Sequence, residues 1–198
     1  FSSQFLITAL GILSEPYIPN IKGINDFKGQ SWHTSNWPKE EVKTSNKRIG
    51  VIGTGATGVQ LITELAKDVE ELYVFQLKPE YCIPLHNDKI DEATQKDIKK
   101  NQDKIFEQCN NSYGSFLHDF KYDQSALDVS EEERNAFYEK LWNERGFALW
   151  LGNYSDLLTD EKANETISEF VRDKIRSQID DPVTAEKLCP KDHGFGTR

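Results

Sequence analysis

The sequence contains no methionine, few cysteines and no long apolar run, and each shortage excludes a class of protein. Without methionine the 198-residue chain lacks the start residue of a natural reading frame, so we expect a piece of a longer protein. The three cysteines, Cys82, Cys109 and Cys189, are too widely spaced for a C-x-x-C metal site or a disulfide framework, so we predict reduced thiols and no metal. No stretch approaches the roughly 18 apolar residues of a membrane-spanning helix, and the first residues lack the charged region of a secretion signal.

Basic residues are scarce as well. The 24 lysines and arginines are outnumbered by 33 acidic residues, which gives a formal net charge of -9. This charge repels phosphate backbones and anionic lipid, so it predicts neither a nucleic acid nor a membrane as partner. We therefore expect a globular, cytoplasmic protein.

The first half of the chain has the pattern of a nucleotide-binding unit. Residues 5–10 (FLITAL) read as a buried strand whose sheet neighbours would lie before residue 1. The glycines and prolines that follow predict a connector over residues 12–46. Residues 48–52 predict a strand that leads into a glycine-rich turn, an amphipathic helix and a further strand at residues 72–75. Strand, turn, helix and strand within about thirty residues form the first half of a mononucleotide-binding unit.

The second half has charged, helix-forming sequence, and we expect a helical insertion over residues 91–187. One face of a first helix is formed by Ile98, Ile105, Phe106 and Cys109. Ser130 and Glu133 form a capping box that predicts the start of a second helix, for which Gly146 is the stop. A third amphipathic stripe ends at Pro182, and that proline can begin a short further turn.

The glycine turn is the clearest pattern with a chemical purpose. In G-x-G-x-x-G the first glycine makes the bend, the second lets a pyrophosphate approach, and the third lets the helix pack closely on the strand. The pattern also occurs as a structural turn, but its place between a strand and a helix favours a dinucleotide site. The residues that we predict to bind the dinucleotide here are Gly53, Thr54, Gly55, Ala56, Thr57, Gly58, Val59 and Gln60.

The end of the second strand predicts which dinucleotide binds. NAD-specific sites place a carboxylate there, on the ribose 2′-hydroxyl, whereas this chain has Gln76, Leu77 and Lys78. Lys78 can neutralise a 2′-phosphate, so these residues favour NADPH over NADH. The alternative is that Lys78 is a solvated turn lysine without a ligand.

A loop with two tryptophans, residues 27–38, carries the most specific pattern; we name it the fingerprint loop. Its residues fit F-x-G-x-x-x-H-x-x-x-W-P through Phe27, Gly29, His33 and Trp37. From the residues alone, His33 is better explained as part of a packed aromatic cluster. The spacing, however, resembles the fingerprint of Baeyer–Villiger monooxygenases, which lies just before their NADPH-binding glycine turn.

The resemblance extends along nearly the whole chain. The opening ITALGILSEPYIPNIKG resembles the strand and linker by which the family leaves its FAD-binding domain, although the usual A-T-G reads A-L-G here. The stretch LYVFQLKPEYCIP resembles the family's second strand and the segment after it, and LCPKDHGFGTR resembles the return to the active site. An α/β fold is implied, a Rossmann-like NADP-binding domain with a helical insertion and a piece of the FAD-binding domain. Its expected parts are the end of the FAD-binding domain with the fingerprint loop (residues 1–40), half of the NADP-binding domain (41–90), the helical insertion (91–187) and a return segment (188–198).

Two positions qualify the resemblance. Leu77 stands where the family usually has the arginine that grips the 2′-phosphate, so Lys78 would have to substitute for it. By spacing, Arg198 matches a basic residue that also meets the 2′-phosphate. If the spacing slips by one residue, Arg198 is instead the arginine that supports the reactive flavin. No other residue is given a catalytic role.

The resemblance implies an FAD- and NADPH-dependent monooxygenase that inserts one oxygen atom from O2 into a ketone to give an ester or lactone. His33 would then be a linker residue that couples domains. Because the chain lacks the first glycine turn, which would bind FAD, we expect the 198 residues alone to be inactive. Two alternatives stay open. A flavin-containing or N-hydroxylating monooxygenase is disfavoured by Trp37 and by the helical insertion, and a noncatalytic NADP-binding module is the other.

Overall fold

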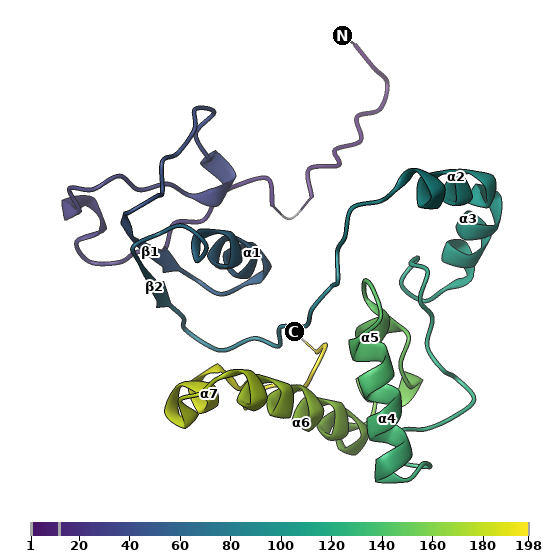
Figure 1. Cartoon of the computed structure of the whole chain (residues 1–198). Coiled ribbons are helices and arrows are strands. Elements are labelled where there is room, and N and C mark those ends of the chain that lie inside the picture. The colour runs from purple at the N-terminus through teal and green to yellow at the C-terminus, as the bar shows by residue number, and fades with distance from the viewer. Residues whose placement is uncertain (1, 12, 198) are drawn as a thin grey trace. The chain divides into compact units, whose positions relative to one another are not determined.

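The computed structural model describes residues 2–11 and 13–197, which belong to two compact units, Phe1–Gln76 and Leu77–Arg198 (Figure 1). Each unit has its own secondary structure, α/β in the first and helical in the second. The domain boundaries that we expect at residues 40, 90 and 187 stay a prediction, because this division rests on compactness alone.

A parallel pair of strands and one helix form the regular part of the first unit. Strand β1 (Arg48–Ile52) pairs with β2 (Glu71–Phe75), and helix α1 (Ala56–Leu65) makes the connection between them. Parallel strands need such a crossover, because a tight hairpin would reverse the chain. The predicted order of strand, glycine turn, helix and strand is therefore confirmed, and so is the α/β fold class.

The buried strand expected over residues 5–10 is wrong. No strand forms there, and the side chains of Phe5, Leu6, Ile7 and Leu10 are 74–90% exposed. A strand forms only where a neighbour bonds its backbone N–H and C=O groups, and among the described residues the sheet contains β1 and β2 alone. The connector that follows holds two short 3₁₀ helices, η1 (Ile24–Asp26) and η2 (Thr34–Asn36).

The second unit is helical, as expected for the insertion. In chain order its helices are α2 (Glu92–Lys100), α3 (Gln102–Asn111), α4 (Glu131–Trp142), α5 (Ala148–Leu151), the 3₁₀ helix η3 (Ser155–Leu158), α6 (Glu161–Gln178) and α7 (Pro182–Leu188). No helix in the part of the chain that the structure describes is long and apolar enough to cross a lipid bilayer.

The first of the expected helices is in fact two. Asn101, between α2 and α3, has φ −104° and ψ 14°, outside the helical region. Its side-chain amide donates to the backbone carbonyl of Asp97 at 3.0 Å and to the carboxylate of Asp97 at 2.9 Å. An asparagine that bonds to the backbone in this way competes with helix continuation, which the apolar spacing does not reveal.

Helix α4 begins where the capping box predicts and ends earlier than expected. The Ser130 hydroxyl accepts a hydrogen bond from the Glu133 N–H at 3.2 Å, which confirms the start. The helix ends at Trp142 because the Asn143 side chain bonds to a carbonyl of the last turn. Gly146 lies beyond, with φ 72°, and belongs to the following turn.

The start of α7 is also confirmed. Pro182 is its first residue, and the Asp181 carboxylate accepts a hydrogen bond from the Thr184 N–H at 2.9 Å. Proline suits the first position of a helix because its missing N–H would have no partner there.

Helix α6 supplies the centre of the core of the second unit. Ile167 and Val171 are fully buried, and they pack in one cluster with Tyr138 of α4 and with Tyr154. The Tyr138 hydroxyl meets the Thr166 hydroxyl at 2.7 Å, so its burial leaves no unpaired polar atom. Burial raises the pKa of Tyr138 to about 12.

We predict that Ile167→Ala lowers the free energy of unfolding by about 2–5 kcal/mol, because it leaves a cavity in this cluster. Ile90→Ala is the matched control, since Ile90 is 60% exposed, and it should change stability by no more than about 0.5 kcal/mol. Urea denaturation followed by tryptophan fluorescence measures both. Equal losses in the two variants would contradict the placement of the core.

Candidate dinucleotide-binding site

The glycine turn, residues 53–58, joins the ends of both strands to the start of α1. Gly53 has φ 102°, a conformation that side chains rarely allow, and its N–H donates to the carbonyl of Phe75 at 2.9 Å. The turn is therefore bonded to the carboxyl end of β2. This is the edge at which parallel sheets of this type bind ligands.

The other two glycines have different surroundings. A Cβ added to Gly58 would lie 2.3 Å from the carbonyl oxygen of Gly53, so only glycine fits there. A Cβ added to Gly55 would meet no protein atom within 4 Å. Gly58 thus permits close packing of the helix against the turn, while Gly55 borders open space that a ligand group could fill.

The start of α1 suits an anion. The first N–H groups of any helix lack partners within the helix, and its dipole places partial positive charge there. The first turn of α1 contains no acidic residue that would oppose an anion. Of the predicted binding residues, the exposed ones are Gly55, Ala56, Thr57 and Gln60, and the half-buried ones are Gly53, Thr54, Gly58 and Val59. The residues present therefore fit the pyrophosphate of a dinucleotide.

The fingerprint loop is held by local contacts. Nδ1 of His33 accepts a hydrogen bond from the Ser35 N–H at 3.1 Å and caps η2. The rings of Trp32 and Trp37 are tilted against each other with centroids 6.0 Å apart. The ring of Phe27 covers Gly29, where a Cβ would lie 2.5 Å from it. These contacts explain the spacing of the loop, and the role of His33 between domains stays a prediction.

Leu77 and Lys78 begin the second unit. Leu77 is 94% exposed, and the ammonium of Lys78 forms an ion pair with the carboxylate of Asp192. Lys78 is thus held by an acid of the return segment, a contact that sequence reasoning did not predict. Arg198, the other predicted ligand of the 2′-phosphate, lies outside the described residues.

Helix α6 holds the return segment through a row of buried polar side chains, Asn164, Ser168 and Arg172, which we name the polar row. The Asn164 amide donates to the carbonyl of Phe195 at 2.9 Å, and the Ser168 hydroxyl accepts from the Phe195 N–H at 3.0 Å. The Arg172 guanidinium donates to the carbonyl of Pro190 at 3.4 Å. Sequence reasoning missed these residues, although polar side chains four apart beside an apolar stripe were a usable signal.

The charge of Arg172 survives its burial. Burial lowers the pKa of its guanidinium, but the interactions with Glu169, Tyr81 and Glu165 together raise it by more, so the net pKa shift is upward. The same guanidinium donates to the hydroxyl of Tyr81 at 3.0 Å. Arg172 therefore bonds both to the return segment and to the chain just after Lys78.

Tyr81 and Glu80 also contact the return segment. The Tyr81 ring packs edge-on against His193 and Phe195, with centroids 5.4 and 5.7 Å away. Its hydroxyl donates to the carbonyl of His193 at 3.3 Å, and Glu80 lies 3.4 Å from Nε2 of His193. Residues 78–81 and the return segment are thus packed as one structure.

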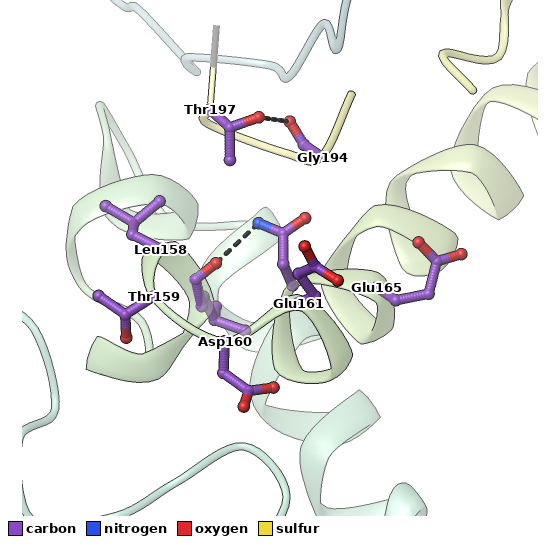
Figure 2. A pocket seen from close by; sticks show the side chains of 9 residues that line it. Leu158, Thr159, Asp160, Glu161, Glu165, Gly194 and Thr197 are labelled. Carbon is purple, nitrogen blue, oxygen red and sulfur yellow. Dashed lines mark hydrogen bonds between the residues drawn. The ribbon is translucent and has the colours of Figure 1, made fainter. Parts of the chain in front are cut away.

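A cavity of about 370 Å³ lies between the start of α6 and the return segment. Figure 2 shows the acidic side chains of Asp160, Glu161 and Glu165 on one side of it and Gly194 and Thr197 on the other. The Thr197 hydroxyl donates to the carbonyl of Gly194 at 2.8 Å. Three carboxylates disfavour a phosphate group there, so this cavity is no candidate for the dinucleotide.

Residues 2–134 match the model of the pyridine nucleotide-disulphide oxidoreductase family. The chain belongs to this family. It is 45% identical to cyclohexanone 1,2-monooxygenase of Acinetobacter sp, over 97% of this chain and 35% of the relative. It is 42% identical to a Baeyer–Villiger monooxygenase of Pseudooceanicola batsensis, over 96% of this chain and 35% of the relative. The resemblance to Baeyer–Villiger monooxygenases is confirmed.

One solved structure and one further relative are also similar to this chain. The crystal structure of OTEMO in complex with FAD and NADP superposes with a TM-score of 0.92 at 42% identity, over 95% of this chain and 36% of that one. Phenazine N-monooxygenase PhzNO1 of Lysobacter antibioticus is 40% identical over 97% of this chain and 35% of the relative. The chain thus spans about a third of the length of the curated relatives that it matches.

We predict that Gly58→Ala destabilises the first unit by about 3 kcal/mol, because the new methyl group meets the Gly53 carbonyl and the backbone must move. Gly55→Ala should cost less than about 1 kcal/mol, because its methyl group meets open space at an ordinary φ of −70°. Hydrogen exchange of the β1 and β2 amides compares the variants. A larger loss of amide protection in Gly55→Ala than in Gly58→Ala would contradict this structure of the turn.

Proposed function

We propose that this chain is the NADPH-binding part of an FAD-dependent monooxygenase that inserts one oxygen atom from O2 into a ketone, giving an ester or lactone. The observation that carries the proposal is the glycine turn, which opens at Gly55 onto space beside the start of α1. The proposal is supported by the similarity of almost the whole chain to Baeyer–Villiger monooxygenases.

Each part of the site would bind one part of the dinucleotide. The N–H groups at the start of α1 donate to the pyrophosphate, and the absent side chain of Gly55 lets it approach. Lys78 and Arg198 neutralise the 2′-phosphate. When bound, the two cofactors supply the hydride and oxygen chemistry, and the protein supplies position and charge.

Preference for NADPH would rest on these two cations. The side chain of Leu77 is almost fully exposed to solvent and has neither a hydrogen-bond donor nor a charge that could bind the 2′-phosphate. Lys78 forms an ion pair with Asp192, and this carboxylate partly neutralises the charge that a 2′-phosphate would meet. We therefore propose a weaker preference for NADPH over NADH than an arginine at position 77 would give.

Oxygenation at nitrogen is the second candidate, since a phenazine N-monooxygenase is 40% identical to this chain. The similarity covers about a third of that relative, and about a third of the ketone-oxidising relatives as well. It therefore does not distinguish oxygenation at nitrogen from oxygenation of a ketone. A cytoplasmic location is part of the proposal as well, because Cys82, Cys109 and Cys189 are all free thiols, as in a reducing compartment.

The test is an assay of the full gene product with bound FAD. NADPH oxidation and O2 uptake are measured with cyclohexanone, a thioether and a tertiary amine, and the products are identified by mass spectrometry. A lactone from cyclohexanone supports the proposal. An N-oxide without any lactone supports the second candidate, and nucleotide binding without oxygen uptake leaves a noncatalytic NADP-binding module.

We predict that Leu77→Arg lowers the dissociation constant for NADP⁺ roughly tenfold, because a guanidinium can form charge-assisted bonds to the 2′-phosphate. Leu77→Gln is the control, since it adds polarity without charge. The dissociation constant for NAD⁺ should be unchanged in both. Titration calorimetry of the unaltered protein and both variants with each nucleotide measures all six values, and equal gains for NADP⁺ and NAD⁺ would contradict a phosphate contact at this position.

A further inference from the structure

The ion pair between Lys78 and Asp192 joins residues 114 positions apart in the chain. It links the segment that follows β2 in sequence with the return segment. The side chains of Lys78 and Asp192 are 51% and 39% exposed, so a ligand group can reach the ammonium from solvent. The pair is therefore a contact that a bound anion could replace.

Asp192 is held in place by its neighbours. One carboxylate oxygen bonds to Lys78, and the other lies 2.8 Å from Nδ1 of His193. On either side of it, Pro190 and Phe195 are bonded to the polar row of α6. Lys78 and the His193 ring hold the pKa of Asp192 well below its usual range, so the carboxylate is charged at neutral pH.

Lys78 is the more adaptable partner. Its four-carbon stem is flexible and carries a compact point charge, which can turn from one anion to another. A carboxylate and a phosphate placed on one ammonium repel each other, so each weakens the binding of the other.

We propose that Asp192 sets the selectivity of this site for the 2′-phosphate by competing with it for Lys78. NADPH must draw the ammonium from Asp192, whereas NADH binds without disturbing the pair. Asp192 thereby reduces the preference for NADPH. This inference rests on the proposed nucleotide site, and it adds a selectivity residue that does not itself donate to the cofactor.

The test is binding of two nucleotide probes to the purified protein, 2′,5′-ADP and 5′-AMP, by titration calorimetry. Asp192→Asn keeps the shape and the acceptor for His193 while it removes the charge. We expect this substitution to increase the affinity for 2′,5′-ADP roughly two- to fivefold, which corresponds to the free energy of an exposed ion pair. The affinity for 5′-AMP should be unchanged.

Two controls separate competition for Lys78 from a general change in charge. Asp173→Asn removes the same charge from an aspartate that pairs with Arg176 at 2.8 Å. It should change the affinity for neither probe. Lys78→Ala should lower the affinity for 2′,5′-ADP. Adding Asp192→Asn to Lys78→Ala should not raise that affinity again.

Each outcome decides the inference. A gain for 2′,5′-ADP that vanishes with Lys78→Ala supports competition. An unchanged or weaker 2′,5′-ADP affinity in Asp192→Asn overturns it, and so does a gain that persists without Lys78. If the unaltered protein binds neither probe at millimolar concentration, the nucleotide site itself fails and this inference fails with it.

Discussion

The second unit depends on a buried row of hydrogen bonds along one face of α6. Asn164, Ser168 and Arg172 lie four residues apart, and each bonds to the backbone of the return segment. Buried polar groups are tolerated only when paired, so this row admits the return segment in one arrangement. The Asn164 amide lies 2.1 Å from where a Cβ on Gly194 would be, so the segment must also carry glycine there.

The polar row has a consequence for the candidate site. Arg172 bonds to Tyr81 as well as to Pro190, and Tyr81 packs on His193 and Phe195. The residues just after Lys78 are therefore fixed to the segment that leads to Arg198. Lys78 thus adjoins a segment packed against residues 190–195, although more than a hundred residues separate the two segments in sequence.

The helices of the second unit gain a role from this arrangement. Its own core, around Ile167 and Tyr138, keeps α6 in place, and α6 in turn orients the return segment. Packing of this kind transmits position well because protein interiors are dense and do not deform continuously. These helices therefore support the segment that carries Lys78 and the segment that leads to Arg198.

Sequence alone determined what depends on neighbours along the chain. The glycine turn, α1 and the caps at Ser130 and Asp181 follow from backbone conformation and side-chain bonds within a few residues. Strands β1 and β2 pair with each other across the short crossover that α1 makes. Tertiary structure decided the rest. A strand over residues 5–10 needs a partner that no local pattern supplies, and the contacts of Lys78 with Asp192 and of α6 with Phe195 join distant segments. Such contacts depend on how the whole unit packs, and the spacing of polar residues along α6 does not reveal which segment they bond to.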